Sequence, residues 1–195
     1  FASLQIRNTA TIGGNICRAS PSGETLAPLL VLEAEAKLTF SDGEKTEAFN
    51  SLFQGPGRTS LGSNGLLTEI EIPYPPKSSR GVYLKHAVRG AMDIAMVAVA
   101  VLVAPDATNA YLQDVRIGLG AVAPTPMRAT RAEELLRGKF PSAAVVREAG
   151  QSAASESSPI SDQRSSAEYR RWIVEALTRR GLEQCWKAAT GKEVL

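Results

Sequence analysis

The stretch that decides the fold runs from Gln5 to Glu24 and reads QIRNTATIGGNICRASPSGE. At its centre, Gly13 and Gly14 lack a Cβ atom, so the backbone can approach a ligand closely and leave amides free to bind an anion. Thr11 and Asn15 flank the pair with a hydroxyl and an amide. These residues predict a loop that binds a phosphorylated ligand, although a Gly-Gly pair after a strand is also typical of an ordinary tight turn.

Glu24 ends this stretch at the predicted start of a helix. Its carboxylate can accept hydrogen bonds from ligand hydroxyls, so with the glycine pair it describes a site for a phosphorylated, hydroxyl-rich ligand. The glycine spacing fits neither G-x-G-x-x-G nor a Walker loop, which excludes a Rossmann or a P-loop interpretation.

Downstream, the pattern predicts one helix followed by antiparallel strands. The apolar run at 26–34 predicts the helix, with Pro28 in its first turn, where a missing N–H costs little. Residues 36–40 and 46–49 flank a Ser-Asp-Gly-Glu turn and predict a hairpin. The Glu/Ile alternation from Glu69 to Tyr74 predicts a strand with one wet face.

The segment Pro75–Ser79 predicts a linker, because its prolines and serines interrupt both periodicities. We therefore expect one domain over residues 1–78 and a second over residues 79–195. The alternative is that residues 82–88 still pair with the first sheet.

The second half predicts two more strands, over 93–104 and 110–121, and then three helices. Thr130-x-x-Glu133 and Ser165-x-x-Glu168 are capping-box patterns that predict helix starts. Gly181 is predicted to end the last helix. The residues predicted to pack into the core from that helix, at helical spacing, are Tyr169, Trp172, Ile173, Ala176 and Leu177.

Composition excludes several classes of protein. A net charge of +2 with interspersed acids and bases argues against nucleic-acid binding. No apolar run reaches the ~20 residues that cross a bilayer. The single histidine, His86, and the two distant cysteines, Cys17 and Cys185, predict neither a metal site nor a disulfide, and they fit a reduced, cytoplasmic protein. The start at Phe1 rather than Met suggests that residues are missing in front of it.

Five motifs, in order, resemble the FAD-binding medium subunits of molybdenum hydroxylases, the family of the carbon monoxide and xanthine dehydrogenases. They are QIRNTATIGGN with ASPSGE at 5–24, LLTEIEIP at 66–73, the K-x₃-R-x-A-x-DIA segment at 85–95, GLGAVAPTP at 118–126 and PISD-x-R-x-SA-x-YR at 159–170.

The resemblance implies an α+β fold in two parts. Residues 1–78 would be the C-terminal part of an FAD-binding domain of the vanillyl-alcohol-oxidase (PCMH) type, an antiparallel sheet with a helix. Residues 79–195 would be a CO dehydrogenase flavoprotein C-terminal-like domain, a small sheet with three helices. The family's upstream AGGT-like motif is absent here, so the full FAD site needs an upstream subdomain.

The resemblance also implies the cofactor contacts. Thr11, Gly13, Gly14 and Asn15 would line the FAD diphosphate and ribityl region. Glu24 stands where many relatives have Asp. Leu67 and Lys85 match residues that, in the family, lie near the adenine or isoalloxazine portion of FAD.

Several of these residues also have a purely structural interpretation. Lys85 either places a cation near the flavin or is a surface lysine on a strand, and His86 is expected on the opposite face. Cys17, just beyond the glycine pair, either lies close to the cofactor or, as we expect, is a small buried side chain. Asp93 is predicted to be a strand-start or turn carboxylate, not a general base. We expect no catalytic side chain and no metal ligand.

The function implied is electron transfer from [2Fe-2S] clusters through FAD to an external acceptor. Molybdopterin and [2Fe-2S] would belong only to partners, a molybdopterin large subunit and an iron–sulfur small subunit, in a hetero-oligomer. The alternative is a flavin-free interaction or assembly module that retains the fold, favoured by the missing upstream motif and by Glu24.

Overall fold

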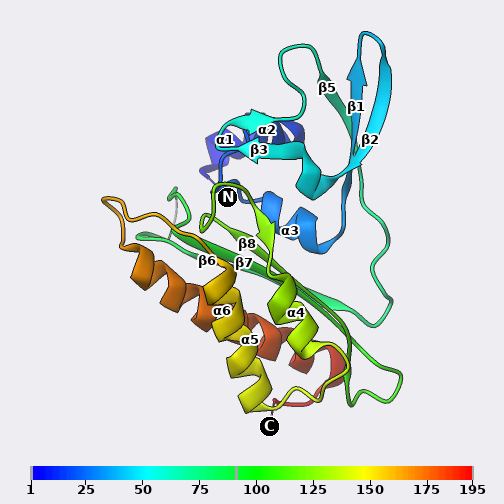
Figure 1. Cartoon of the computed structure of the whole chain (residues 1–195), viewed down its shortest axis with the longest axis vertical. Helices are drawn as coiled ribbons and strands as arrows, with labels where there is room; N and C mark the ends of the chain where they lie inside the picture. The colour runs from blue at the N-terminus through cyan, green and yellow to red at the C-terminus, as the bar shows by residue number, and fades with distance from the viewer. Residues whose placement is uncertain (1, 91, 195) are drawn as a thin grey trace.

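Three antiparallel sheets organise the computed structural model, which describes residues 2–90 and 92–194 (Figure 1). The N-terminal elements are α1 (Leu4–Thr9), α2 (Ile12–Cys17), α3 (Leu26–Val31), β1 (Glu35–Phe40), β2 (Gly43–Ala48), the 3-10 helix η1 (Phe49–Leu52), β3 (Phe53–Gly55), β4 (Arg58–Thr59) and β5 (Leu66–Glu71). The C-terminal elements are β6 (Arg80–His86), β7 (Val97–Pro105), β8 (Leu112–Gly120), β9 (Met127–Arg128), α4 (Thr130–Leu136), α5 (Ala143–Glu156) and α6 (Ala167–Thr190).

The first sheet has the order β2-β1-β5 and contains the predicted hairpin. β5 begins three residues earlier than predicted, at Leu66 rather than Glu69, and ends at Glu71. The shift arises because pairing with β1 places Leu67 and Ile70 against the core of this sheet, while Pro73 cannot donate to a strand ladder. Ile72, predicted to lie in the strand, is exposed.

The larger sheet has the order β6-β7-β8-β9. Its strands β7 and β8 confirm the two predicted strands over 97–104 and 112–120, whereas residues 93–96 precede β7. β6 pairs with β7 along its whole length, so the alternative in which residues 82–88 join the first sheet is wrong. The predicted linker lies between the two sheets, outside any strand.

β7 is buried on both faces, and each face packs against a different layer (Figure 1). Val99 and Val101 belong to the large core formed with α4, α5 and α6. Ala100 and Leu102 face the other way and pack against Ala27 and Val31 of α3. Because side chains alternate along a strand, this single strand joins the C-terminal helices to the helix that follows the glycine pair.

Both predicted capping boxes are wrong in detail. Thr130 is not a cap: the carboxylate of Glu156, the last residue of α5, accepts the amides of Arg131 and Ala132 at 3.1 and 3.0 Å. Glu133 forms an ion pair with Arg128 instead of capping the helix. The cap of α6 is shifted by one residue.

α6 starts and ends at other residues than predicted. Its N-cap is Ser166, whose hydroxyl accepts the amide of Tyr169 at 3.1 Å. Gly181 does not end the helix. It lies in its middle, where an added Cβ would be 2.7 Å from a methyl of Val101, so it permits close packing on β7. The end is Gly191, with a left-handed φ of 72°.

The predicted buried stripe of α6 is also wrong in part. Trp172 is 61% exposed and Tyr169 is 39% exposed. The residues that α6 buries follow the contact with β7, and they are Arg170, Val174, Leu177, Thr178, Gly181, Leu182, Cys185 and Trp186. No helix in the described part of the chain is long and apolar enough to cross a membrane.

Candidate FAD-binding site

Gly13 and Gly14 lie in the first turn of α2, not in a loop as the sequence predicted. Thr11 is the N-cap, and its side-chain oxygen accepts the amide of Gly14 at 2.9 Å. The loop prediction fails because this hydroxyl satisfies an amide that a loop would have left free, and so starts a helix. The surroundings of the two glycines differ. Apart from its chain neighbours and the backbone of its own helix, a Cβ added at Gly13 meets no described atom within 4 Å, whereas one at Gly14 lies 3.0 Å from the Thr11 hydroxyl.

Asn15 connects α2 to the start of α3. Its Oδ1 accepts a hydrogen bond from the hydroxyl of Thr25 at 2.7 Å and from the amide of Thr25 at 3.3 Å. Thr25 is the N-cap residue of α3 and has no side-chain cap bond of its own. Because the carbonyl side of the Asn15 amide is engaged, its Nδ2 group is the side that can donate to a ligand oxygen.

Glu24 and Lys85 form an ion pair that links the segment before α3 to β6. The Lys85 ammonium also donates to the backbone carbonyl of Asp93 at 2.6 Å. The side chains of Glu24 and Lys85 are only 12% and 23% exposed, so the pair lies mostly out of water. Lys85 is therefore neither an isolated cation nor a free surface lysine, since its charge is shared with a carboxylate 61 positions earlier.

Asp93 lies in the irregular segment between β6 and β7. The amides of Arg89 and Ile94 donate to its carboxylate at 2.8 and 3.0 Å. These bonds, that of Arg89 foremost, hold the pKa of the Asp93 carboxyl below its usual value. His86 lies on the face opposite Lys85, as predicted, with its Nε2 atom 3.2 Å from the hydroxyl of Tyr169 on α6.

The structure brings together six of the seven predicted residues. Ile12, within α2, and Glu24 line one hollow beside the start of α3, and Asn15 bonds to the same helix start. Leu67 is the exception: it lies on β5 and packs against the core of the first sheet. Its strand partner is Leu38 of β1.

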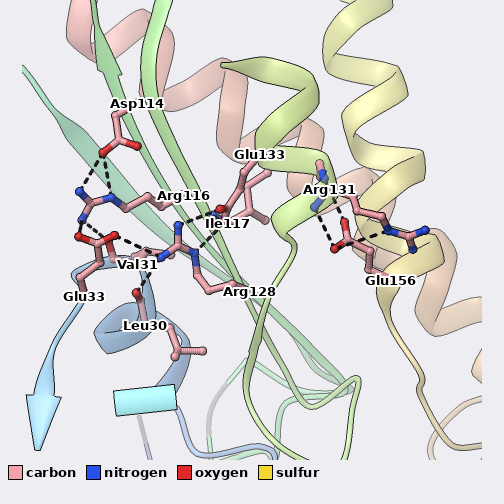
Figure 2. Close-up of polar contacts among 11 residues, drawn as sticks. Leu30, Val31, Glu33, Asp114, Arg116, Ile117, Arg128, Arg131, Glu133 and Glu156 are labelled. Carbon is pink, nitrogen blue, oxygen red and sulfur yellow. Dashed lines mark hydrogen bonds and ion pairs between the residues drawn. The ribbon is translucent and has the colours of Figure 1, made fainter. Parts of the chain in front are cut away.

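The C-terminal end of α3 is held by two arginines of the larger sheet, as Figure 2 shows. Arg116 of β8 donates to the carbonyl of Val31 at 3.2 Å and pairs with Glu33 at 3.1 Å. Arg128 of β9 donates to the carbonyl of Leu30 at 3.4 Å and lies 3.8 Å from Glu33. The last carbonyls of a helix carry partial negative charge, so two cations there anchor α3 on the larger sheet.

Each arginine is oriented by a second carboxylate from the C-terminal part (Figure 2). Asp114 pairs with Arg116 at 2.8 Å. Glu133, which is 4% exposed, accepts from Arg128 at 2.5 and 2.8 Å and from the amide of Ile117 at 2.8 Å. Sequence reasoning missed this network, and its residues carry no motif that could have revealed it.

Cys17 and Thr25 differ from what the sequence predicted. Cys17 is exposed, so the prediction of a buried side chain is wrong; α2 buries Ile16 instead. Thr25 was not predicted as part of the site, although the Ser-Gly-Glu-Thr run before an apolar helix was the available signal. In the described residues, no group of three or more His, Cys, Asp or Glu side chains is placed to hold a metal ion.

Two family profiles match most of the chain. Residues 1–75 match the FAD binding domain in molybdopterin dehydrogenase, and residues 82–185 match the CO dehydrogenase flavoprotein C-terminal domain. This chain belongs to the xanthine and CO dehydrogenase flavoprotein family. The resemblance carried by the five motifs and the α+β fold are both confirmed.

Curated relatives in this family include the putative xanthine dehydrogenase FAD-binding subunit of Escherichia coli strain K12, 31% identical over 98% of this chain and 65% of the relative. The carbon monoxide dehydrogenase medium chain of Afipia carboxidovorans is 32% identical over 94% of this chain and 63% of its own. A solved carbon monoxide dehydrogenase structure from Hydrogenophaga pseudoflava superimposes with a TM-score of 0.92 at 29% identity, over 97% of this chain and 65% of that one. The chain thus spans slightly less than two thirds of these flavoprotein relatives.

Proposed function

We propose that this chain is part of an FAD-binding electron-transfer subunit of a molybdenum hydroxylase. Its membership of the flavoprotein family supports this function. The single observation that carries it is the open space at Gly13, beside Asn15 and near the Glu24–Lys85 pair. A phosphate group binds where no side chain blocks its approach to the backbone and where hydrogen-bond donors lie alongside.

The residues fit the chemical groups of FAD. Gly13 and Gly14 offer close approach for the diphosphate, and Asn15 offers an amide donor. Glu24 supplies an acceptor for hydroxyls of the ribityl or ribose, and Lys85 a donor held against it. Leu67 is retained as an apolar contact near a ring of the cofactor. FAD, when bound, supplies the redox chemistry, and the protein contributes binding, orientation and electrostatics without a catalytic side chain.

The partners follow from the same proposal. Electrons would arrive from an iron–sulfur small subunit that carries [2Fe-2S] clusters, after substrate oxidation on a molybdopterin large subunit. The chain would pass them to an external acceptor within a cytoplasmic hetero-oligomer. We propose a boundary between residues 78 and 79, so that residues 1–78 form part of the FAD domain and residues 79–195 a second domain.

The test is a graded substitution at Gly13 in the natural full-length gene product. Gly13→Ala and Gly13→Val add bulk to space that no described atom occupies, so the apo protein should keep its urea midpoint. Flavin content after desalting should fall from near-stoichiometric in the wild type to partial in the alanine variant and near zero in the valine variant. Full flavin in Gly13→Val would show that the diphosphate lies elsewhere.

Gly14→Val is a less specific variant, because its Cβ would press on the Thr11 hydroxyl and disturb the cap of α2. It should lose flavin and stability together. Comparison of the two glycines therefore separates filling of the ligand space from damage to the helix.

A second candidate function is a flavin-free interaction or assembly module with the same fold. The observation that favours it is that Glu24 and Lys85 satisfy each other within the chain. A wild-type gene product that is folded by circular dichroism, yet purifies without flavin and does not take up added FAD, would support this function over the first.

A further inference from the structure

Tyr83 carries a buried hydroxyl that has no partner. It lies on β6 opposite Ala100 of β7, on the same sheet face as Lys85. Its Oη atom is shielded from solvent and makes no hydrogen bond to any residue in 2–90 or 92–194. A buried hydroxyl without a partner lowers the stability of a fold, so each such group calls for an explanation.

The surroundings of Tyr83 combine apolar walls with polar groups. A hollow of about 360 Å³ lies beside the start of α3, with walls from Ile12, Pro28 and Leu29. Glu24 and Thr25 line it together with Tyr83. Burial, and then the negative charge of Glu24, raise the pKa of the Tyr83 phenol. The hydroxyl therefore stays protonated and can donate as well as accept.

We propose that Tyr83 is a further cofactor-binding residue, whose hydroxyl bonds a ribityl or ribose hydroxyl of FAD beside Glu24. This inference rests on the proposed function. FAD presents chains of hydroxyls next to flat apolar rings. The exposed lining of the hollow is mostly apolar, and Glu24, Thr25 and Tyr83 are the lining residues that carry polar groups. No sequence motif assigned Tyr83 a role; β6 places it two residues before Lys85, next to a carboxylate from the other half of the chain.

The test is Tyr83→Phe, which removes only the Oη atom, in the natural full-length gene product. Without flavin, the variant should melt at the same temperature as the wild type or higher, because the unsatisfied hydroxyl is gone. With FAD, it should show a dissociation constant about 3- to 10-fold higher, the loss expected for one hydrogen bond. Flavin fluorescence quenching gives the affinity and differential scanning fluorimetry gives the melting temperature.

Tyr111→Phe is the matched control, because Tyr111 is 51% exposed and lies next to β8, where it should change neither quantity. A merely structural hydroxyl would shift the melting temperature equally with and without FAD. An unchanged affinity in Tyr83→Phe, with wild-type flavin binding intact, would overturn this inference alone. A wild type that binds no FAD would overturn it together with the proposed function.

Discussion

A Cβ atom placed on Gly118 would lie 2.6 Å from the carbonyl oxygen of Ala27, so α3 approaches β8 more closely than any side chain there permits. The same atom would lie 3.1 Å from a methyl of Val31. Gly118 therefore determines the distance between α3 and the larger sheet. The positions of Thr25 and Glu24, at the start of α3, depend on that distance.

Gly118→Ala should push α3 away from the sheet and lower the free energy of unfolding by about 1–3 kcal/mol, the usual cost of an overpacked core. Urea denaturation followed by circular dichroism measures it. Gly81→Ala is the control, because Gly81 is an exposed position of β6 and a Cβ there would only contact a carbonyl oxygen at 3.4 Å. Equal midpoints for the two variants would contradict the tight approach.

Glu133→Ala should be among the most destabilising changes, because it leaves the Arg128 guanidinium and the Ile117 amide without their buried carboxylate. Removing one partner of a buried ion pair costs about 3–5 kcal/mol. The exposed neighbour Glu134 provides the control, and Glu134→Ala should leave the midpoint of thermal unfolding unchanged. A small effect at Glu133 would mean that Arg128 finds another carboxylate acceptor, such as Glu33, which lies 3.8 Å away.

Thr11→Val should lower stability by about 1 kcal/mol, because the Gly14 amide loses its acceptor at the start of α2. Thr11→Ser keeps the hydroxyl and should restore the wild-type value. Local hydrogen exchange at Gly14 is the sharper measurement, since it should accelerate in the valine variant only. No acceleration would show that another group caps the helix.

Asp162 links stability to pH. The amide of Arg164 and the guanidinium of Arg170, which lies 2.7 Å away, lower the pKa of the Asp162 carboxyl from 3.8 to about 2. A lowered folded-state pKa stabilises the protein fully above the unfolded value and loses that effect as pH falls through the folded value. Asp162→Asn should therefore be less stable than the wild type at pH 6, with the difference shrinking between pH 4 and 2. A constant difference across that range would exclude the ionised carboxylate as its source.

The two tryptophans should behave in opposite ways. Trp186 is 1% exposed within the core of the larger sheet, so Trp186→Ala should cost about 3–5 kcal/mol. Trp172 is 61% exposed, and Trp172→Ala should stay within about 0.5 kcal/mol of the wild type. Chemical denaturation of both variants measures the contrast, and similar losses would contradict the orientation of α6.

Local chemistry predicted much of this fold. The hairpin of β1 and β2 follows from a Ser-Asp-Gly-Glu turn between strands, and β7 and β8 from runs of β-branched residues. Local patterns failed where a residue distant in the sequence made the interaction that a neighbouring residue was predicted to make. Thr130 lost its capping role to Glu156, which comes from another helix and 26 positions later in the chain.

Helical spacing alone could not say which face of α6 is buried. Tyr169 and Trp172 form an apolar stripe, yet the face that packs on β7 is marked by Gly181, which lacks any side chain. Of the candidate site, local chemistry indicated Thr11, Gly13, Gly14, Asn15 and Glu24. The family resemblance added Leu67 and Lys85. The pairing of Glu24 with Lys85 depends on how two sheets meet, which no local pattern encodes.

The packing of α3 on β7 has a mechanical consequence. On one face of β7, Ala100 and Leu102 form a small core with α3. The opposite face of β7 packs against the C-terminal helices. Arg116 and Arg128 hydrogen-bond to carbonyls at the C-terminal end of α3. Closely packed interiors transmit displacement instead of absorbing it. A ligand seated at the start of α3 would thus keep a constant separation from the C-terminal helices on the far face of the sheet.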